Sequence, residues 1–140
     1  MVETRLIVID TNVFLELFLG QTKAKDCEVL LNEVSEGKIE AVVTHFTVHA
    51  VEAALGSSKL LIAFLRNLES SQGLSIYYTG ISEEISIAML MERMGLNFDD
   101  ALQYYVAKRL GGETIVSFDK HFDNLDVPRV EPSQVVRRRA

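Results

Sequence analysis

Short runs of apolar residues alternate along the chain with longer stretches in which apolar positions recur at helical spacing. The first run, residues 6–9, is continuous, which is typical of a strand buried on both faces. Similar runs, rich in β-forming residues, follow at residues 39–43, 74–78 and 114–117. A last run at residues 127–130 contains Pro128, which a sheet tolerates at its edge. These runs predict the strands of one sheet.

The stretches between the runs predict amphipathic helices. Their apolar stripes lie within residues 12–19, 24–34, 48–55, 61–68, 82–94 and 99–110. The predicted N-caps are Thr22, then Thr44 or Thr47, then Ser57 or Ser58, with the later helix beginning at Ser82. The stripes predict that Leu65 and Leu110 are buried, and they place Ile85 and Met89 on one face of their helix.

Strands that alternate with helices predict right-handed βαβ crossovers and a parallel sheet covered on both faces. We therefore expect an α/β fold. The chain has 140 residues and shows no repeat, low-complexity block or Pro/Ser-rich linker, so residues 1–140 are expected to form a single domain.

The composition narrows the class of protein. A hydrophobic content of 48%, with 8 Gly and 2 Pro, argues against a disordered or fibrous chain. One cysteine, Cys27, excludes a disulfide framework and a zinc ribbon, and it suits a reducing compartment. The longest apolar run, residues 60–65, is too short to span a bilayer, and the N-terminus lacks a signal-peptide pattern. The expectation is a cytoplasmic protein without membrane association.

The net charge of −6 argues at first against binding to nucleic acid through its phosphates. An acidic cluster can nevertheless recruit divalent cations that then bind phosphate. The basic run Arg137, Arg138 and Arg139 closes the chain, and it reads either as a solvated tail or as an RNA contact.

Four acidic residues stand where apolar or neutral residues are expected. Asp10 and Asp119 each follow an apolar strand, so they should share the carboxyl edge of the sheet, where open α/β sheets bind ligands. Glu52 interrupts an apolar helical stripe, and Asp100 lies in the first turn of a helix. Taken singly, Asp10 reads as a helix cap and Asp100 as a partner of the helix dipole.

Carboxylates that converge without a basic partner repel one another in a partly dry cleft. A hard divalent cation with oxygen ligands, Mg²⁺ or Mn²⁺, would resolve that repulsion. Such an ion can activate a water molecule and neutralise charge that develops on a phosphodiester.

These residues lie in four motifs: IDTNVF at residues 9–14, THFTVHAVEAAL at residues 44–55, FDDAL at residues 98–102 and VSFDKHF at residues 116–122. In this order and spacing they resemble the PIN-domain ribonucleases, and most closely the single-domain toxins of VapBC-type toxin–antitoxin pairs. The resemblance implies a three-layer α/β/α fold with a mainly parallel sheet of about four to five strands. It also implies that Asp10, Glu52, Asp100 and Asp119 are the catalytic, metal-binding acids, supported by Asn12 and Ser117.

The function implied by the resemblance is a metal-dependent endoribonuclease that uses Mg²⁺ (or Mn²⁺) and acts on RNA. Its implied partners are an antitoxin protein and a second copy of the chain, and apolar helix residues such as Met89 and Met94 are consistent with such an interface. The alternative is a PIN-fold protein-interaction or regulatory module without significant nuclease activity.

Other readings of single residues stay open. His45, His49 and Glu52 share one helical face and could bind zinc, although HFTVH lacks the glutamate that metalloproteases carry after the first histidine. Asp99 is expected to cap its helix, with Asp100 facing inward, and Asp123 reads as loop surface or as an outer carboxylate.

Two further alternatives concern substrate chemistry. The IDTN turn faintly resembles phosphoaspartyl enzymes, whose site needs a lysine on the same edge, and Lys120 is the only late candidate. The pairs at residues 77–78 and 104–105 are tyrosines that could stack on nucleobases, although one of each pair is expected in the core.

Overall fold

The structure is a computed structural model that describes residues 6–139 and the side chains of residues 6–136. The strands are β1 (Leu6–Ile9), β2 (Glu40–Thr44), β3 (Leu74–Tyr77), β4 (Thr114–Val116) and β5 (Arg129–Val130). The helices are α1 (Thr11–Phe18), α2 (Ala24–Ser35), α3 (His45–Ala54), α4 (Ser58–Ser70), α5 (Ile81–Met94), α6 (Phe98–Leu110) and α7 (Pro132–Arg139), with a short 3-10 helix η1 (Lys120–Phe122).

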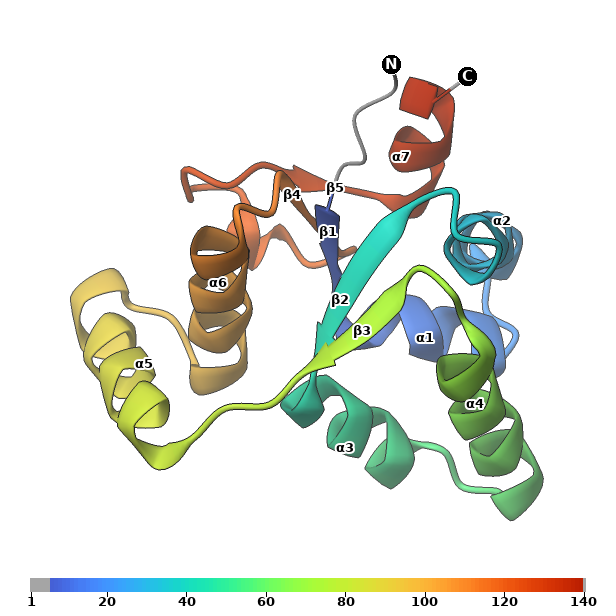
Figure 1. The fold of residues 1–140 in the computed structure, drawn as a ribbon, viewed down its shortest axis with the longest axis horizontal. Coiled ribbons are helices and arrows are strands. Elements are labelled where there is room, and N and C mark those ends of the chain that lie inside the picture. Colours follow the sequence, from blue (N-terminus) through green and yellow to red (C-terminus); the bar gives the residue numbers. More distant parts are fainter. Residues whose placement is uncertain (1–5, 140) are drawn as a thin grey trace.

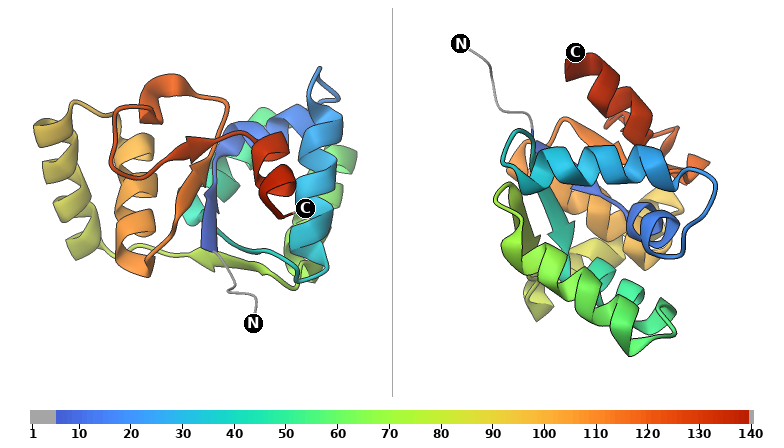
Figure 2. Two further views of the ribbon diagram at one scale, coloured as in Figure 1. Left: turned by 90° about the horizontal axis from the view of Figure 1, so that it is seen from above. Right: turned by 90° about the vertical axis from the view of Figure 1, so that its right-hand side faces the viewer.

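The strands form one parallel sheet in the order β3-β2-β1-β4-β5. Helices cover both faces: α5 and α6 lie on one side, and α1, α2, α3, α4 and α7 on the other (Figures 1 and 2). The expected three-layer α/β/α fold with a mainly parallel sheet is confirmed. The short strand β5 follows Pro128 and lies at a sheet edge, where a residue without an N–H is tolerated.

Two hydrophobic cores, one on each face, hold the layers together. The continuous apolar run of β1 supplies both, because Ile7 and Ile9 point into one core and Val8 into the other. Fully buried aromatic rings anchor the first core, where Phe14 and Phe64 meet edge to face at 5.4 Å between ring centroids. Because successive side chains of a strand point to opposite faces, a continuous apolar run fits the strand at the centre of a sheet that is covered on both sides.

The predicted caps of two helices are confirmed. Thr44 caps α3 by accepting a hydrogen bond from the backbone N–H of Thr47, and Ser57 caps α4 in the same way. Thr22 is not the N-cap of α2, which begins after Lys23 without a side-chain cap. Instead, the backbone N–H of Lys23 donates to Glu16 on the preceding helix, so a longer-range contact takes the place of the local cap.

Some residues of the predicted apolar stripes are exposed on three helices, α4, α5 and α6. In α5, Ile85 and Met89 are exposed and Ile87 is the residue buried in the core, because α5 lies outside α6 and reaches the sheet little. Leu65 and Leu110 are exposed as well.

Helix α7 was not predicted, although Val135 on it packs into the first core. The side chains of residues 137–139, the basic run, lie outside the described residues. Within the part of the chain that the structure describes, no helix is long and apolar enough to cross a membrane.

Candidate metal centre

The carboxyl ends of β1 and β4 bring the first site residues together. These strands pair in parallel with Ile9 beside Val116, so Asp10 and Ser117, the next residues on each strand, become neighbours. The backbone N–H of Asp10 continues the ladder to the carbonyl of Val116 at 3.0 Å. The expectation that these strand ends share one edge of the sheet is confirmed.

Three donors fix the carboxylate of Asp10, which is only 5% exposed. The backbone N–H of Thr11 and the amide Nε2 of Gln103 each donate to Oδ1 at 2.7 Å, and the Ser117 hydroxyl donates to Oδ2 at 2.6 Å. Asp10 is therefore both the N-cap of α1 and a carboxylate held in a single orientation. Such bonds to an anionic oxygen are stronger than those between neutral groups.

Asn12 and Ser117 tie the two strand ends to each other. The amide Nδ2 of Asn12 donates to the Ser117 hydroxyl at 3.2 Å, and its Oδ1 accepts from the backbone N–H of Phe118 at 3.3 Å. The same hydroxyl accepts from the backbone N–H of Asp119 at 2.9 Å. Ser117 thus connects the carboxylate after β1 to the loop that carries Asp119, which is a supporting geometry of the kind expected for both residues.

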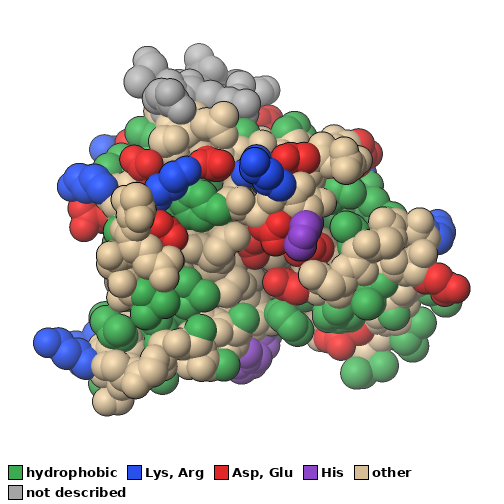
Figure 3. All heavy atoms as spheres, turned by 180° about the vertical axis from the view of Figure 1, so that it is seen from behind, with side chains coloured by type: hydrophobic (Ala, Val, Ile, Leu, Met, Phe, Trp, Pro, Cys, Tyr) green, Lys and Arg blue, Asp and Glu red, His purple; other side chains and the backbone are tan. Residues whose placement is uncertain are grey.

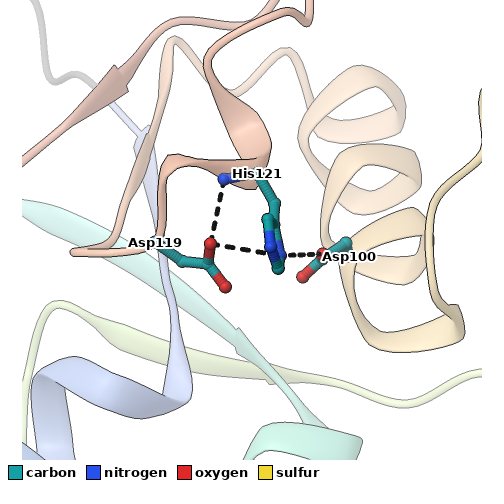
Figure 4. A group of neighbouring side chains, drawn as sticks. All are labelled: Asp100, Asp119 and His121. Atoms are coloured by element: carbon teal, nitrogen blue, oxygen red, sulfur yellow. Dashed lines mark hydrogen bonds and ion pairs between the residues drawn. The ribbon is translucent and has the colours of Figure 1, made fainter.

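Asp100, Asp119 and His121 form a compact group at this edge, the acidic group (Figure 4). His121 Nδ1 lies 3.1 Å from Asp119 Oδ1 and 3.5 Å from Asp100 Oδ2. One ligand atom from each of the three residues lies within 4.8 Å of the others. Oxygen and nitrogen atoms around one small divalent ion sit about 2 Å from it, so ligand atoms at this spacing can share an ion.

Burial and neighbouring carboxylates raise the pKa of two acids of the site. Burial, with the charge of Asp10 next in importance, raises the pKa of Asp99 to about 6. Burial and then the charge of Asp119 raise the pKa of Asp100 as well. The site therefore disfavours negative charge, and a cation bound there would relieve that cost.

The predicted roles of Asp99 as a helix cap and Asp100 as an inward-facing acid were only partly correct. Asp100 is buried and faces the group, as expected, but the cap of α6 is Asn97, whose Oδ1 accepts from the backbone N–H of Asp100. Asp99 accepts a hydrogen bond from Gln103 at 3.2 Å, the same amide that holds Asp10. Asn97 rather than Asp99 caps α6, so the carboxylates of Asp99 and Asp100 both contribute to the electrostatics of the site.

Glu52 lies on α3 and is not part of the three-residue group. Its side chain is 31% exposed, and its Oε1 is 2.7 Å from His49 Nδ1. Among the described residues, Asp100, Asp119 and His121 are the set whose ligand atoms converge, and His45, His49 and Glu52 are not such a set. The zinc reading of these histidines gains no support.

Sequence reasoning missed two residues of this site. Gln103 lies four positions after Asp99, and a helical projection would have placed it on the same face of α6. His121 follows Asp119 by two positions, a spacing that a search for mixed His/Asp ligands would have noted. Asp123, in contrast, pairs with Arg129 at 2.6 Å and belongs to the loop rather than to the acidic group.

The surface reflects this arrangement. Figure 3 shows acidic side chains gathered beside a histidine in a hollow of one face, with Lys and Arg side chains along one side of it. In the group of Asp100, Asp119 and His121, the His121 side chain is 67% exposed and that of Asp100 is 7% exposed, so the group is open to solvent on the side of His121. An incoming ligand would thus meet a buried acidic floor with an accessible imidazole at its border.

The family of the chain follows from its sequence profile together with this fold. The PIN domain matches residues 7–128, which is most of the chain and includes every residue of the acidic group. The chain belongs to the PIN domain family. No curated protein gives a significant match to this PIN domain.

Several solved structures are similar to this PIN domain. VapC20 of Mycobacterium tuberculosis, a sarcin-ricin loop cleaving toxin, has a TM-score of 0.74 and 16% sequence identity, over 90% of this chain and 99% of that chain. A toxin–antitoxin complex from Klebsiella pneumoniae has a TM-score of 0.68 and 17% identity, over 90% and 97% of the two chains. VapBC2 from Rickettsia felis, bound to a DNA fragment from its promoter, has a TM-score of 0.62, 13% identity and coverages of 90% and 98%. At these identities the likeness is one of fold.

Proposed function

We propose that this PIN domain is a metal-dependent endoribonuclease and the toxin of a VapBC-type toxin–antitoxin pair. The observation that carries the proposal is the convergence of Asp100, Asp119 and His121 at the carboxyl edge of the sheet, with Asp10 near enough for its charge to contribute to the raised pKa of Asp100. Burial and the neighbouring carboxylates raise the pKa of Asp99 and Asp100, so the charged forms of these acids are unfavourable where they lie. Charged groups that are held together although this lowers the stability of the fold are typical of a functional site.

Asp100, Asp119 and His121 are the residues proposed to hold the ion, with Asp10 beside them. Carboxylate oxygens suit Mg²⁺, and the imidazole makes Mn²⁺ equally acceptable. When bound, the ion supplies an activated water and neutralises charge on the phosphodiester. Glu52, on α3, is proposed as a further acid of the site.

The remaining residues orient the acids. Asp10 cannot rotate freely because Thr11, Gln103 and Ser117 all donate to it. Asn12 and Ser117 hold the loop that carries Asp119 at a fixed distance from Asp10. A carboxylate that is oriented in advance loses little entropy when it binds a cation or a polarised water.

The proposed role as a toxin is supported by the similar solved structures. VapC20 is a sarcin-ricin loop cleaving toxin, which supports RNA as the substrate here. The Klebsiella pneumoniae structure is a toxin–antitoxin complex, and FitAcB from Neisseria gonorrhoeae is a further similar structure. We therefore propose an antitoxin protein as the partner, with action in the cytoplasm.

The test is cleavage of labelled single-stranded RNA by purified protein, with Mg²⁺, with Mn²⁺ and with chelator. Wild type should cleave only with metal, and Asp10→Asn and Asp119→Asn should lower the rate by more than about a hundredfold. Asp126→Asn is the matched control, because Asp126 is an exposed acid that pairs with Lys108 outside the group. It should cleave as wild type does.

Two outcomes would contradict the proposal. Cleavage that persists in chelator, or that is equal in wild type and Asp10→Asn, would point to another mechanism or a contaminating nuclease. A wild-type protein that binds a partner but never cleaves RNA would favour the alternative, a PIN-fold interaction module. The toxin role itself is tested by expression: growth arrest should need an intact Asp10, and co-expression of the adjacent open reading frame should relieve it.

A further inference from the structure

Three rings cluster on the surface next to the acidic group without belonging to it. The His45 ring lies 4.1 Å from the His49 ring and 4.5 Å from the Tyr78 ring, measured between centroids. These are contact distances for aromatic and imidazole rings, so the three form one continuous patch.

The topology places this patch on the same edge of the sheet as the acidic group. Thr44 pairs with Tyr77 at the carboxyl ends of β2 and β3, and His45 and Tyr78 are the next residues on each strand. Asp10 occupies the equivalent position after β1, which is the neighbour of β2. The patch and the acids therefore follow one another along a single edge.

The patch is not part of the core. Tyr78 is 63% exposed, and the His49 side chain is 63% exposed. His49 is also the partner of Glu52, at 2.7 Å. Figure 3 shows histidine side chains at two places on the face with the acidic hollow, one beside the hollow and one below it.

Charge provides a second argument. The chain has a net charge of −6, and the centre of the site is acidic, so phosphate contacts alone would hold a nucleic acid weakly. Flat rings bind any unpaired base through its face, and this attraction does not depend on the charge of the protein. An acidic nuclease surface thus gains most from aromatic contacts close to its reacting centre.

We propose that His45, His49 and Tyr78 form a stacking subsite for an unpaired nucleobase of the RNA, one or a few nucleotides from the phosphodiester at the acidic group. The ligand class rests on the proposed function, since only an RNA substrate gives the subsite a role. The subsite selects single-stranded segments and loops, because bases in a duplex do not expose their faces. It acts in binding and does not enter the chemical step.

The experiment measures binding and cleavage separately. Wild type, Tyr78→Ala and Tyr78→Phe are each combined with Asp119→Asn, so that the RNA stays intact during titration. The probe is a short single-stranded RNA with 2-aminopurine in place of one base, and an abasic RNA of equal length is the matched ligand. Ile62→Ala on α4, which removes another exposed apolar side chain, is the control variant.

Tyr78→Ala should weaken binding of the base-containing RNA about tenfold and abolish the quenching of 2-aminopurine. Tyr78→Phe and Ile62→Ala should bind as wild type does, and the abasic RNA should bind wild type and Tyr78→Ala equally. Without Asp119→Asn, Tyr78→Ala should raise KM for RNA and leave kcat near its wild-type value. Equal melting temperatures for Tyr78→Ala and Ile62→Ala would verify that both are folded.

Several results would overturn the subsite. One is equal loss of affinity for intact and abasic RNA. Another is a change in the oligomeric state of Tyr78→Ala, which would assign the patch to a protein interface.

Two further results separate the subsite from the proposed function. A protein that stacks the base but does not cleave RNA would leave the subsite standing and remove the proposed function. A protein that cleaves RNA with Tyr78→Ala unaffected would do the reverse.

Discussion

The side-chain amide of Gln103 on α6 donates a 2.7 Å hydrogen bond to Oδ1 of Asp10 at the end of β1. Gln103 is fully buried, and its Nε2 also donates to Asp99 at 3.2 Å. Its Oε1 is buried without a hydrogen-bond partner among the described residues. A buried amide whose oxygen is left unpaired is costly, so its retention is explained by the two carboxylates that its nitrogen holds.

We therefore predict that Gln103→Met, which keeps the side-chain volume but removes the donor, lowers the free energy of unfolding by about 1–3 kcal/mol. RNA cleavage should fall because Asp10 loses one of the donors that orient it, and the apparent affinity for Mn²⁺ should fall by about tenfold or more. Denaturant unfolding and metal titration check both effects. Full metal affinity in a destabilised Gln103→Met would show that the amide serves packing alone.

The raised pKa of Asp99 predicts a pH dependence of stability without metal. The folded-state pKa of about 6 lies above the ordinary aspartate pKa of 3.8, so the folded protein binds more protons between these two values. Stability should therefore be highest at low pH within this window and fall as the pH rises toward about 6, by up to about 2 kcal/mol. Urea unfolding of wild type and Asp99→Asn across this range, in chelator, measures the effect. The slope should be reduced in Asp99→Asn, and an equal slope in both proteins would contradict the assignment.

Repulsion among the acids predicts that Asp119→Asn melts higher than wild type without metal, by about 3 °C. The asparagine can still accept from the backbone N–H of His121, while it removes a charge beside Asp100. Mn²⁺ should stabilise wild type in a concentration-dependent way and stabilise Asp119→Asn far less. Thermal melts with chelator and with Mn²⁺ compare the two, and Asp126→Asn should respond to the metal as wild type does.

Asp10→Asn should behave differently from Asp119→Asn. Both carboxylate oxygens of Asp10 accept hydrogen bonds, so an amide there turns one acceptor into a donor facing Gln103 or Ser117. We expect Asp10→Asn to be less stable than wild type by about 1–3 kcal/mol even in chelator. A rise in melting temperature for this variant would mean that repulsion outweighs the hydrogen bonds at Asp10.

Gly73 gives a prediction about the fold alone. A Cβ at this position would lie 2.2 Å from the carbonyl oxygen of Ile39 and 2.7 Å from that of Val34. Gly73→Ala must therefore displace backbone at the start of β3. We expect it to lower the free energy of unfolding by about 2 kcal/mol or more. Gly56→Ala is the matched control, because a Cβ there meets nothing within 4 Å. Similar denaturation midpoints for the two variants would contradict the steric argument.

The sequence alone determined the class of fold and most element positions. Continuous apolar runs give buried parallel strands, as at β1, and hydroxyl side chains before apolar stripes give helix starts, as at Thr44 and Ser57. These are local signals, since each depends on residues within a few positions. Asp10 and Asp119 could be placed on one edge because parallel strands share their direction.

Only the tertiary structure decided which side chains meet there. Gln103 and His121 join the acids because α6 packs over β1 and because the loop after β4 turns back toward α6. Their spacing from Asp99 and Asp119 in the sequence indicates a shared helix face and a shared loop, but it does not predict these contacts. Glu52 pairs with His49 on its own helix and is not one of the three residues whose ligand atoms lie together, although its motif is as clear as that of Asp100. The exposure of apolar residues on α5 was also decided by the tertiary structure. A helical repeat shows that one face of a helix is apolar, but it does not show whether another element covers that face. Periodicity along the chain fixes local conformation, whereas contacts between distant segments depend on packing that no short stretch of sequence contains.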